Sequence, residues 1–146
     1  MANILIACEE SQAICMAFRK RGYNAFSCDI LKCSGGHPEW HFNQDVLQVI
    51  PNHGGHLESG DEYYLPEGEE WDLLIANPPC TYLSVSGARW LYHPDDANLP
   101  IEQRREHPHH IGRRKMKEEA EKFFLEFTRT KVKCWAIENP VGCMNT

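Results

Sequence analysis

The chain has 146 residues, of which 42% are hydrophobic and 25% are charged, and its formal net charge is −6. This length suits one hydrophobic core, so we expect a single domain over residues 1–146. No apolar run approaches the roughly 20 residues that cross a bilayer, which predicts a soluble protein with no membrane partner. The negative charge gives no overall attraction to nucleic acid, although a local basic patch can supply one.

The cysteines predict a reducing compartment. There are seven of them, an odd number, and none forms a Cys-x-x-Cys pair. The N-terminus leads into a short apolar run rather than a signal peptide, so we expect a cytoplasmic protein. The spacing of Cys28, Cys33, His37 and His41 could gather a zinc ion, but Cys28 lies inside a predicted strand. We therefore predict no metal site.

The first half of the chain predicts strands that alternate with short helices. Residues 4–7 are an apolar run typical of a strand, and a turn and an amphipathic helix follow them. Residues 25–28 predict a second strand that ends at Asp29. This acid comes ~20 residues after the first strand, where dinucleotide-binding folds place an acid that binds ribose. Further on, Asp45 is a plausible N-cap for a short helix or turn over 46–50.

In the second half, a predicted strand over 71–76 runs into the sequence Asn-Pro-Pro-Cys, which ends at Cys80. Adjacent prolines donate no ladder hydrogen bonds, so the strand must stop and present the thiol at its end. The proline-containing segment 81–112 predicts a mobile lid or binding loop. The last predicted strand ends at Glu138. Before it, a helix over 115–129 carries an apolar stripe that we interpret as core, formed by Met116, Ala120, Phe123, Phe124 and Phe127.

This alternation predicts an α/β fold with a mostly parallel sheet of about five strands and flanking helices. Open parallel sheets bind their ligands at the carboxyl ends of the strands. Cys80 and Glu138 each follow a different predicted strand. A thiol and a carboxyl group are therefore both expected at the edge where such sheets carry out chemistry.

The order of these features resembles S-adenosylmethionine-dependent cytosine-5 DNA methyltransferases, and more closely the short methylase-like proteins encoded by bacteriophages. The matching strings are Cys-Ser-Gly-Gly-His-Pro-Glu-Trp-His at 33–41, Pro-Pro-Cys-Thr-Tyr-Leu at 78–83 and Glu-Asn-Pro-Val-Gly at 138–142. The resemblance covers essentially the whole chain. It implies a Rossmann-like methyltransferase fold without the family's C-terminal part, in the host cytoplasm if the chain is encoded by a phage.

The resemblance implies methyl transfer to cytosine carbon 5 in DNA, with Cys80 as nucleophile, Glu138 as acid and Asn139 beside them. A thiolate that adds at carbon 6 activates carbon 5, and an acid at ring nitrogen 3 eases the addition. This role needs a lowered thiol pKa and a Glu138 pKa raised by burial. The target base must also be flipped out of the duplex. Alternatively, Cys80 is an inert buried thiol and Glu138 a buried carboxyl satisfied by backbone amides.

The resemblance also implies an S-adenosylmethionine site. Amides at the start of the first helix would bind the methionine carboxylate, Asp29 the ribose hydroxyls, and Asp45 with Val46 the adenine. Read from the residues alone, Asp29 could be a turn acid, Asp45 an ordinary N-cap and Glu9 an acid favoured at a helix start. The cofactor-binding candidates are Ala7, Cys8, Glu9, Ser11, Asp29, Ile30, Asp45, Val46, Asn77 and Pro78.

Two kinds of macromolecular partner are expected. A basic run within or beside the segment 81–112 could clamp DNA phosphates, or could be a solvated surface run. Its candidate contacts are Arg104, Arg105, Arg113, Arg114 and Lys115. The strand that ends at Glu138 lacks the neighbours that the family places beside it, which predicts a homo-oligomer formed through an exposed sheet edge.

Two further functions stay open. The chain could be a catalytically inactive module that keeps a pocket for the cofactor or for nucleic acid, such as a phage counter-defence factor. The string Asn-Pro-Pro-Cys at 77–80 also resembles the Asn-Pro-Pro-aromatic motif of amino-group methylases, in which an aromatic ring stacks on the base. Cys80 stands in place of that ring and favours carbon chemistry, whereas Tyr82 keeps the amino-group alternative open.

Overall fold

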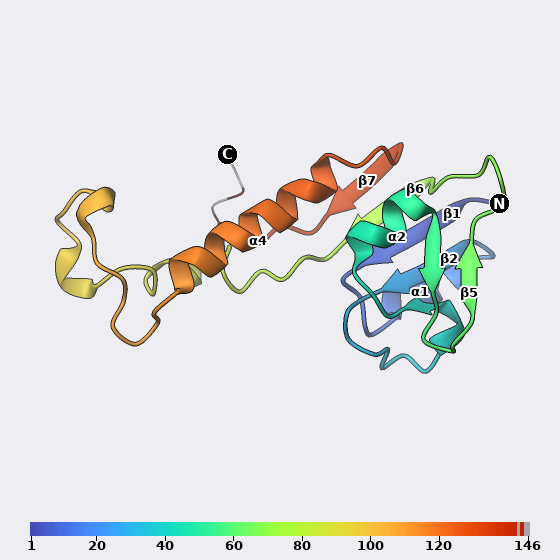
Figure 1. Cartoon of the computed structure of the whole chain (residues 1–146), viewed down its shortest axis with the longest axis horizontal. Helices are drawn as coiled ribbons and strands as arrows, with labels where there is room; N and C mark the ends of the chain where they lie inside the picture. The colour runs from blue at the N-terminus through green and yellow to red at the C-terminus, as the bar shows by residue number, and fades with distance from the viewer. Residues whose placement is uncertain (143, 145–146) are drawn as a thin grey trace. The chain divides into compact units, whose positions relative to one another are not determined.

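The computed structural model describes residues 1–142 and 144, and its main element is a five-stranded parallel sheet (Figure 1). The strand order is β3-β2-β1-β6-β7, and every neighbouring pair is parallel. This confirms the predicted α/β class and is compatible with a Rossmann-like sheet. The strands are β1 (Asn3–Ala7), β2 (Asn24–Cys28), β3 (His41–Phe42), β6 (Leu73–Ala76) and β7 (Cys134–Ile137).

Helices connect most of these strands. Helix α1 (Ala13–Arg19) joins β1 to β2, α2 (Val46–Asn52) follows β3, and α4 (Arg113–Thr128) precedes β7. The shorter helical elements are η1 (Pro38–Trp40), α3 (Val85–Ala88), η2 (Pro94–Asp96) and η3 (Ile101–Gln103). An antiparallel pair, β4 (Gly54–His56) and β5 (Glu62–Tyr64), lies between α2 and β6 in the sequence.

The core surrounds β1, the central strand. Its residues Ile4, Leu5, Ile6 and Ala7 are at most 2% exposed. Such a continuous apolar run is typical of a parallel strand that is covered on both faces. Beside it, the rings of Phe26 and Phe42 lie 5.2 Å apart, and the Trp71 ring lies 6.3 Å from Phe26 and 6.4 Å from Phe42.

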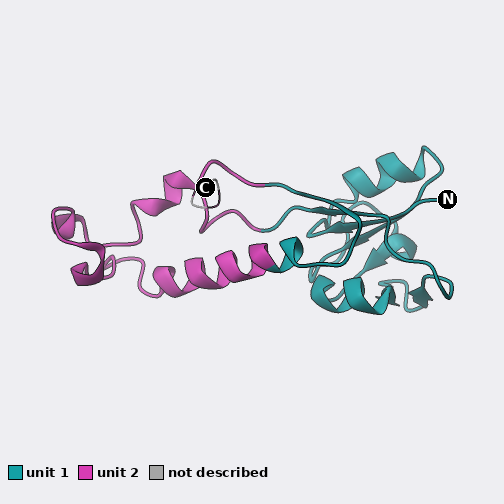
Figure 2. Ribbon diagram, turned by 90° about the horizontal axis from the view of Figure 1, so that it is seen from above, with its two compact units in different colours: residues 1–78, 126–138 teal, residues 79–125, 139–146 magenta. Residues whose placement is uncertain are grey.

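The contacts divide the chain into two compact units, drawn in different colours in Figure 2. Unit 1 comprises residues 1–78 and 126–138 and holds both sheets. Unit 2 comprises residues 79–125 and 139–146 and holds α3, η2, η3 and most of α4. The expected mobile loop 81–112 therefore lies in unit 2 and contains short helical elements. A single folding domain stays a prediction.

Helix α4 begins and ends within two residues of the predicted helix over 115–129. The predicted apolar stripe is buried at its C-terminal end, where Phe124 is 7% exposed and Phe127 is fully buried. At the other end, Met116 is 49% exposed. The interpretation of the stripe as core is therefore correct for only part of the helix.

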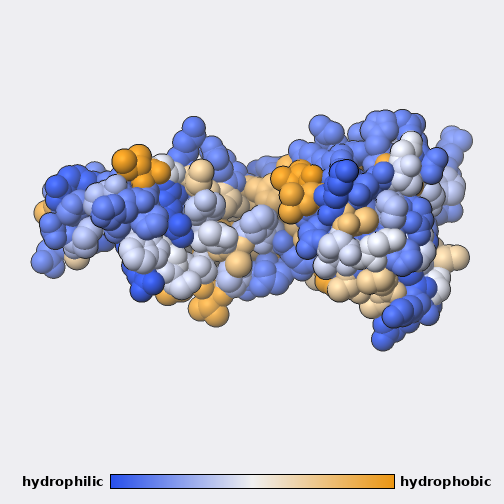
Figure 3. Space-filling view, turned by 90° about the horizontal axis from the view of Figure 1, so that it is seen from below, coloured by the Kyte–Doolittle hydropathy of each residue, from blue (hydrophilic) through white to orange (hydrophobic). Residues whose placement is uncertain are grey.

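The face drawn in Figure 3 is mostly hydrophilic, with apolar side chains in small separate patches. Ile30, Ile111 and Val141 are among the most exposed apolar residues. Isolated exposed apolar residues are normal on a globular protein. Within residues 1–142 and 144, no helix combines the length and the apolar composition that a membrane crossing requires.

Candidate functional site

The carboxyl ends of the parallel strands bring together several of the predicted cofactor residues in unit 1. The register pairs Ala7 with the last residues of β2 and β6, so Cys8, Asp29 and Asn77 follow three neighbouring strand ends. The Asn77 N–H donates to the Ala7 carbonyl at 3.0 Å. Glu138 follows β7, which pairs in parallel with β6. The sheet therefore places these four residues along one edge.

Cys8 lies in an acidic environment at this edge. Its backbone has a left-handed φ of 58°, which turns the chain sharply after β1. Burial, together with the nearby charges of Asp29 and Asp45, raises the pKa of the Cys8 thiol to about 12. The thiol therefore stays protonated at neutral pH. The interaction also shows that Asp29 and Asp45, two of the predicted cofactor residues, both lie close to the turn after β1.

The Glu9 carboxylate caps the first turn of helix α1. Its side chain is only 5% exposed and accepts the N–H groups of Ile14 at 2.5 Å and Cys15 at 3.1 Å. Burial raises the Glu9 pKa, and these two hydrogen bonds oppose the shift. The helix-start amides were expected to bind the methionine carboxylate. Glu9 already occupies them, so this part of the site does not fit the cofactor as the resemblance implied.

Asp45 and Asp29 each accept a hydrogen bond from a nearby backbone N–H group. Asp45 is the N-cap of α2, where its carboxylate accepts the Leu47 N–H at 2.9 Å. Asp29 accepts the Leu31 N–H at 2.9 Å, which is an Asx-type turn. Both local readings of the sequence are therefore correct, and neither excludes a further contact to ribose or adenine.

The other cofactor candidates differ in how accessible they are. Ile30 is 78% exposed, whereas the Val46 side chain is only 4% exposed and belongs to the core. Ser11 is exposed, and its hydroxyl lies 3.5 Å from the Ala13 N–H. Ala7 and Pro78 are buried. Of this group, Ile30 and Ser11 therefore present side chains to a ligand.

A buried polar network that the sequence did not predict ties segment 33–41 to the turn after β1. The Gln12 amide accepts the His37 N–H at 3.0 Å and donates to the His37 carbonyl at 2.8 Å and the Ser27 hydroxyl at 3.2 Å. The buried His41 ring bonds the Ser27 hydroxyl at 2.8 Å and the Leu31 carbonyl at 2.9 Å. A Cβ on Gly35 would lie 2.6 Å from that of Gln12, so only glycine fits there.

The considered zinc ligands have other partners. The Cys28 thiol donates to the Gln44 carbonyl at 3.3 Å, and the His37 ring bonds Glu39 at 2.9 Å. His37 also stacks on Trp40, with ring centroids 4.0 Å apart. Within the part of the chain that the structure describes, no group of three His, Cys, Asp or Glu side chains is arranged to hold a metal ion.

The two catalytic candidates, Cys80 and Glu138, are both exposed. The Cys80 side chain in unit 2 is exposed, so the reading as a buried inert thiol is wrong. Glu138 in unit 1 is also exposed, so the expected burial of this carboxyl is wrong. The physical reason is that β7 is the outer strand of the sheet and residues 134–136 are exposed as well.

Within unit 2, the segment that follows Cys80 pairs with the segment that contains Asn139. The Val85 N–H donates to the Val141 carbonyl at 3.1 Å, and Ser84 forms a β-bridge with Gly142. A Cβ at Gly142 would collide with the Leu83 carbonyl, so glycine is required for this pairing. The loops that follow β6 and β7 therefore meet in one unit.

A cavity of about 300 Å³ in unit 2 is lined in part by sequence neighbours of Cys80. Pro79 and Tyr82 line one part of it, and Met116, Ala120 and Phe123 of α4 line another. The Arg113 guanidinium lies 5.0 Å from the centre of the Tyr82 ring, a cation–π contact. The cavity is at the small end of the range for ligand sites in proteins.

The basic residues predicted to contact phosphate, which are Arg104, Arg105, Arg113, Arg114 and Lys115, all lie in unit 2. Arg105 forms an ion pair with the buried Asp96 at 2.6 Å. Arg104 donates to two loop carbonyls at 2.7 Å and 3.0 Å, and Arg113 donates to the Thr81 carbonyl at 3.0 Å. These three arginines therefore stabilise unit 2 itself, which reduces what they can offer to phosphate.

No family model, curated protein sequence or solved structure matches this chain. The α/β class and the order of the parallel strands are findings of the structure. The methyltransferase resemblance stays a prediction that rests on the sequence strings.

Proposed function

We propose that the protein is an S-adenosylmethionine-dependent DNA methyltransferase of Rossmann-like fold that acts on cytosine carbon 5. One observation carries the proposal. The parallel pairing of β6 with β7 places Asn77 and Glu138 at neighbouring strand ends, and Cys80 follows Asn77 by three residues. Three residues span at most about 10 Å, so the thiol stays within reach of this edge.

Cys80 is the proposed nucleophile because it is exposed. Burial raises the pKa of Cys8 to about 12 and that of Cys15 to about 11, which makes both thiols poor nucleophiles at neutral pH. In the proposed reaction the Cys80 sulfur bonds to carbon 6, and the electron pair of the 5,6 double bond activates carbon 5. Loss of the carbon 5 proton afterwards restores the double bond and expels the thiolate.

Glu138 is the proposed acid, with Asn139 beside it. A protonated carboxyl group at ring nitrogen 3 would reduce the charge that builds up on the ring while sulfur adds. Because Glu138 is exposed in the free protein, the flipped base itself would cover this carboxyl group.

The proposed cofactor residues are those on the sheet edge. S-adenosylmethionine supplies the methyl group that carbon 5 takes up. Asp29 would bind the ribose hydroxyls and Asp45 would lie near the adenine, because both approach the turn at Cys8. The carboxylate of the cofactor must find donors other than the α1 amides, since Glu9 holds those.

The test is covalent trapping on DNA that contains 5-fluorocytosine, with S-adenosylmethionine present. Fluorine at carbon 5 cannot leave as a proton does, so the adduct through Cys80 persists in denaturing gels. We expect an adduct with the native chain and none with Cys80→Ser. The matched control is Cys134→Ser, which removes the other exposed cysteine among the described residues and should keep the adduct. Equal trapping by both variants would contradict the proposal.

The second candidate is a catalytically inactive module that binds the cofactor or nucleic acid, such as a phage counter-defence factor. The occupation of the α1 amides by Glu9 and the exposure of Glu138 favour it. Calorimetric titration with S-adenosylmethionine and its demethylated product separates the candidates. Binding that is weakened by Asp29→Asn, together with no trapped adduct, would support the module over the enzyme.

A further inference from the structure

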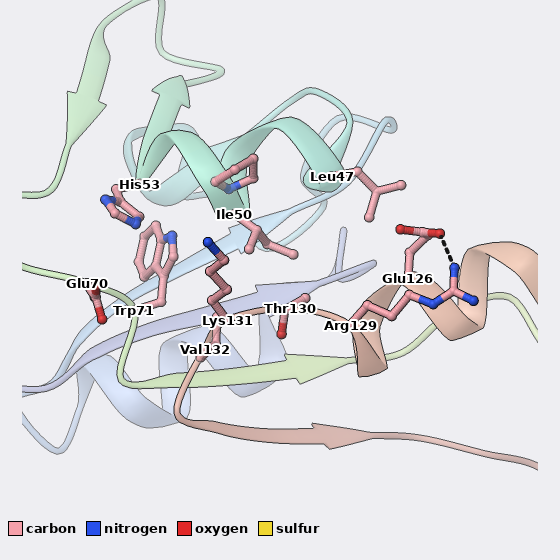
Figure 4. Close-up of a pocket in the computed structure, with 11 residues that line it drawn as sticks. Leu47, Ile50, His53, Glu70, Trp71, Glu126, Arg129, Thr130, Lys131 and Val132 are labelled. Carbon is pink, nitrogen blue, oxygen red and sulfur yellow. Dashed lines mark hydrogen bonds and ion pairs between the residues drawn. The ribbon is translucent and has the colours of Figure 1, made fainter.

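A larger cavity, of about 560 Å³, lies in unit 1 at the other end of the sheet (Figure 4). Its walls come from α2 and the residue after it, from the residues just before β6, and from the end of α4 with the loop that leads to β7. Glu70 and Trp71 come just before β6, and Lys131 and Val132 come just before β7. The cavity therefore lies at the amino ends of these two strands. It is therefore separate from the edge that carries Asp29 and Asn77.

Two buried polar atoms in this cavity have no hydrogen-bond partner among the described residues. They are the indole nitrogen of Trp71 and the hydroxyl oxygen of Thr130. Trp71 is only 1% exposed, and its ring is held by contacts with Phe26 and Phe42. The indole N–H can only donate, and a buried donor without an acceptor is unfavourable. A ligand that accepts a hydrogen bond would satisfy it.

Lys131 supplies a positive charge with which an anionic acceptor in the cavity could pair. Glu126 and Arg129 pair with each other at 3.1 Å, so their charges cancel. Lys131 forms no ion pair within the described residues, and its ammonium group is directed toward Trp71 and Ile50 in Figure 4. Glu70 lies in the wall and is exposed. Its charge would repel a dianion, so a single negative charge fits best.

The remaining wall is apolar. Leu47 and Ile50 of α2 face the cavity with Val132 opposite, and the Trp71 ring adds an aromatic surface. An apolar wall with a few convergent polar groups is the usual composition of a small-molecule site, and this volume is within the usual range. The ligand must therefore combine an apolar body with one acidic group.

We propose that this cavity binds an apolar monocarboxylic acid. The carboxylate would accept a hydrogen bond from the Trp71 indole and would pair with Lys131. The body of the ligand would contact Leu47 and Ile50. This site does not depend on the proposed methyl transfer, because none of its residues takes part in that reaction.

The experiment uses 1-naphthaleneacetate as the probe and its uncharged amide, 1-naphthaleneacetamide, as the matched compound. In ¹⁵N-labelled protein the Trp71 indole signal is identified by its loss in Trp71→Phe. We expect the acid to move this signal downfield in a saturable manner. Lys131→Met should weaken binding about tenfold or more, which is the effect of losing one charge-assisted hydrogen bond. Lys133→Met, a neighbouring exposed lysine outside the cavity, is the control.

Lys131→Met keeps the proposal falsifiable if Trp71→Phe fails to fold, because isothermal titration needs no signal assignment. The proposal is overturned if the acid gives no saturable binding. It is also overturned if acid and amide bind equally well, or if Lys131→Met and Lys133→Met have the same affinity as the native chain.

Discussion

At the scale of single residues, burial divides the thiols into two chemical groups. Cys8, Cys15 and Cys28 all have pKa values raised mainly by burial, whereas the side chains of Cys80 and Cys134 are exposed. A thiol reacts as its thiolate, so a raised pKa and poor access both slow it. Exposure therefore distinguishes the proposed nucleophile from these buried cysteines.

This difference predicts the order of alkylation. With iodoacetamide at mildly alkaline pH, Cys80 and Cys134 should be modified rapidly in the folded protein, and Cys8, Cys15 and Cys28 only after unfolding. Peptide mapping by mass spectrometry measures each site. Modification of Cys28 as fast as that of Cys80 would contradict the buried environment described for β2.

A second residue-scale prediction concerns Asp96. Hydrogen bonds from Arg105 lower the Asp96 pKa from 3.8 to about 2. A lowered folded-state pKa means that the ionised group contributes stability above pH 3.8, and this contribution is lost as the pH falls through about 2. Arg105→Gln should therefore flatten the loss of stability over this range. Acid titration followed by circular dichroism measures it.

The matched control for that titration is Arg104→Gln, because Arg104 bonds backbone carbonyls and not Asp96. It should leave the Asp96 titration unchanged in a carboxyl carbon NMR experiment. An Asp96 pKa that is the same in the native chain and in Arg105→Gln would show that the ion pair does not form in solution.

At the scale of elements, the cap of α2 gives a direct prediction. Asp45→Ala removes the acceptor of the Leu47 N–H and should lower the free energy of unfolding by about 1 kcal/mol. Asp45→Asn should retain most of this stability, because asparagine is an equally good N-cap. Urea unfolding of both variants measures the difference. If the two variants were equally unstable, the charge of Asp45 would matter rather than its cap.

The strands β1 and β2 were predictable from the sequence because their apolar runs are buried. The expected strand over 4–7 is β1, and the expected strand over 25–28 is β2, each extended by one residue. The β4–β5 pair was missed because its residues are polar or glycine and show no alternation. There the Gly54 backbone approaches Tyr63 so closely that a side chain would collide, which only the folded chain reveals.

The candidate site was predictable in its positions and less so in its chemistry. The strand ends placed Asp29, Asn77 and Glu138 on one edge, as expected from a parallel sheet. Glu9 was predicted only as an acid favoured at a helix start, and its hydrogen bonds to the α1 amides were not predicted. These bonds depend on left-handed conformations at Cys8 and Gln12, which bring the carboxylate back onto α1. Glu138 is exposed because β7 is the outer strand of the sheet. The order of the strands is set by their pairing in the folded chain, which the sequence pattern does not reveal.

At the scale of the whole molecule, the outer edge of β7 favours self-association. Among the described strands, β7 is paired on one side only, and its Trp135 is 45% exposed. An open edge with unpaired backbone groups is a template for another strand. We expect light scattering after size-exclusion chromatography to give a mass that rises with concentration, and Trp135→Lys to reduce this rise.

The control for this measurement is Tyr64→Lys, which introduces the same charge at a 49% exposed aromatic residue of β5. It should associate as the native chain does. A monomer mass that is independent of concentration, or equal effects of the two lysine substitutions, would count against pairing through β7.

The central proposal is that Cys80 and Glu138 act on the same cytosine base. The most direct measurement is crosslinking of Cys80 to Glu138→Cys, in a chain that also carries Cys134→Ser, by a bis-methanethiosulfonate linker about as long as a pyrimidine ring is wide. The account predicts a high yield of intrachain crosslink between positions 80 and 138, which is lost when Cys80→Ser is added. If both thiols instead react singly and no crosslink forms, the two groups do not share a site and the proposed reaction is contradicted.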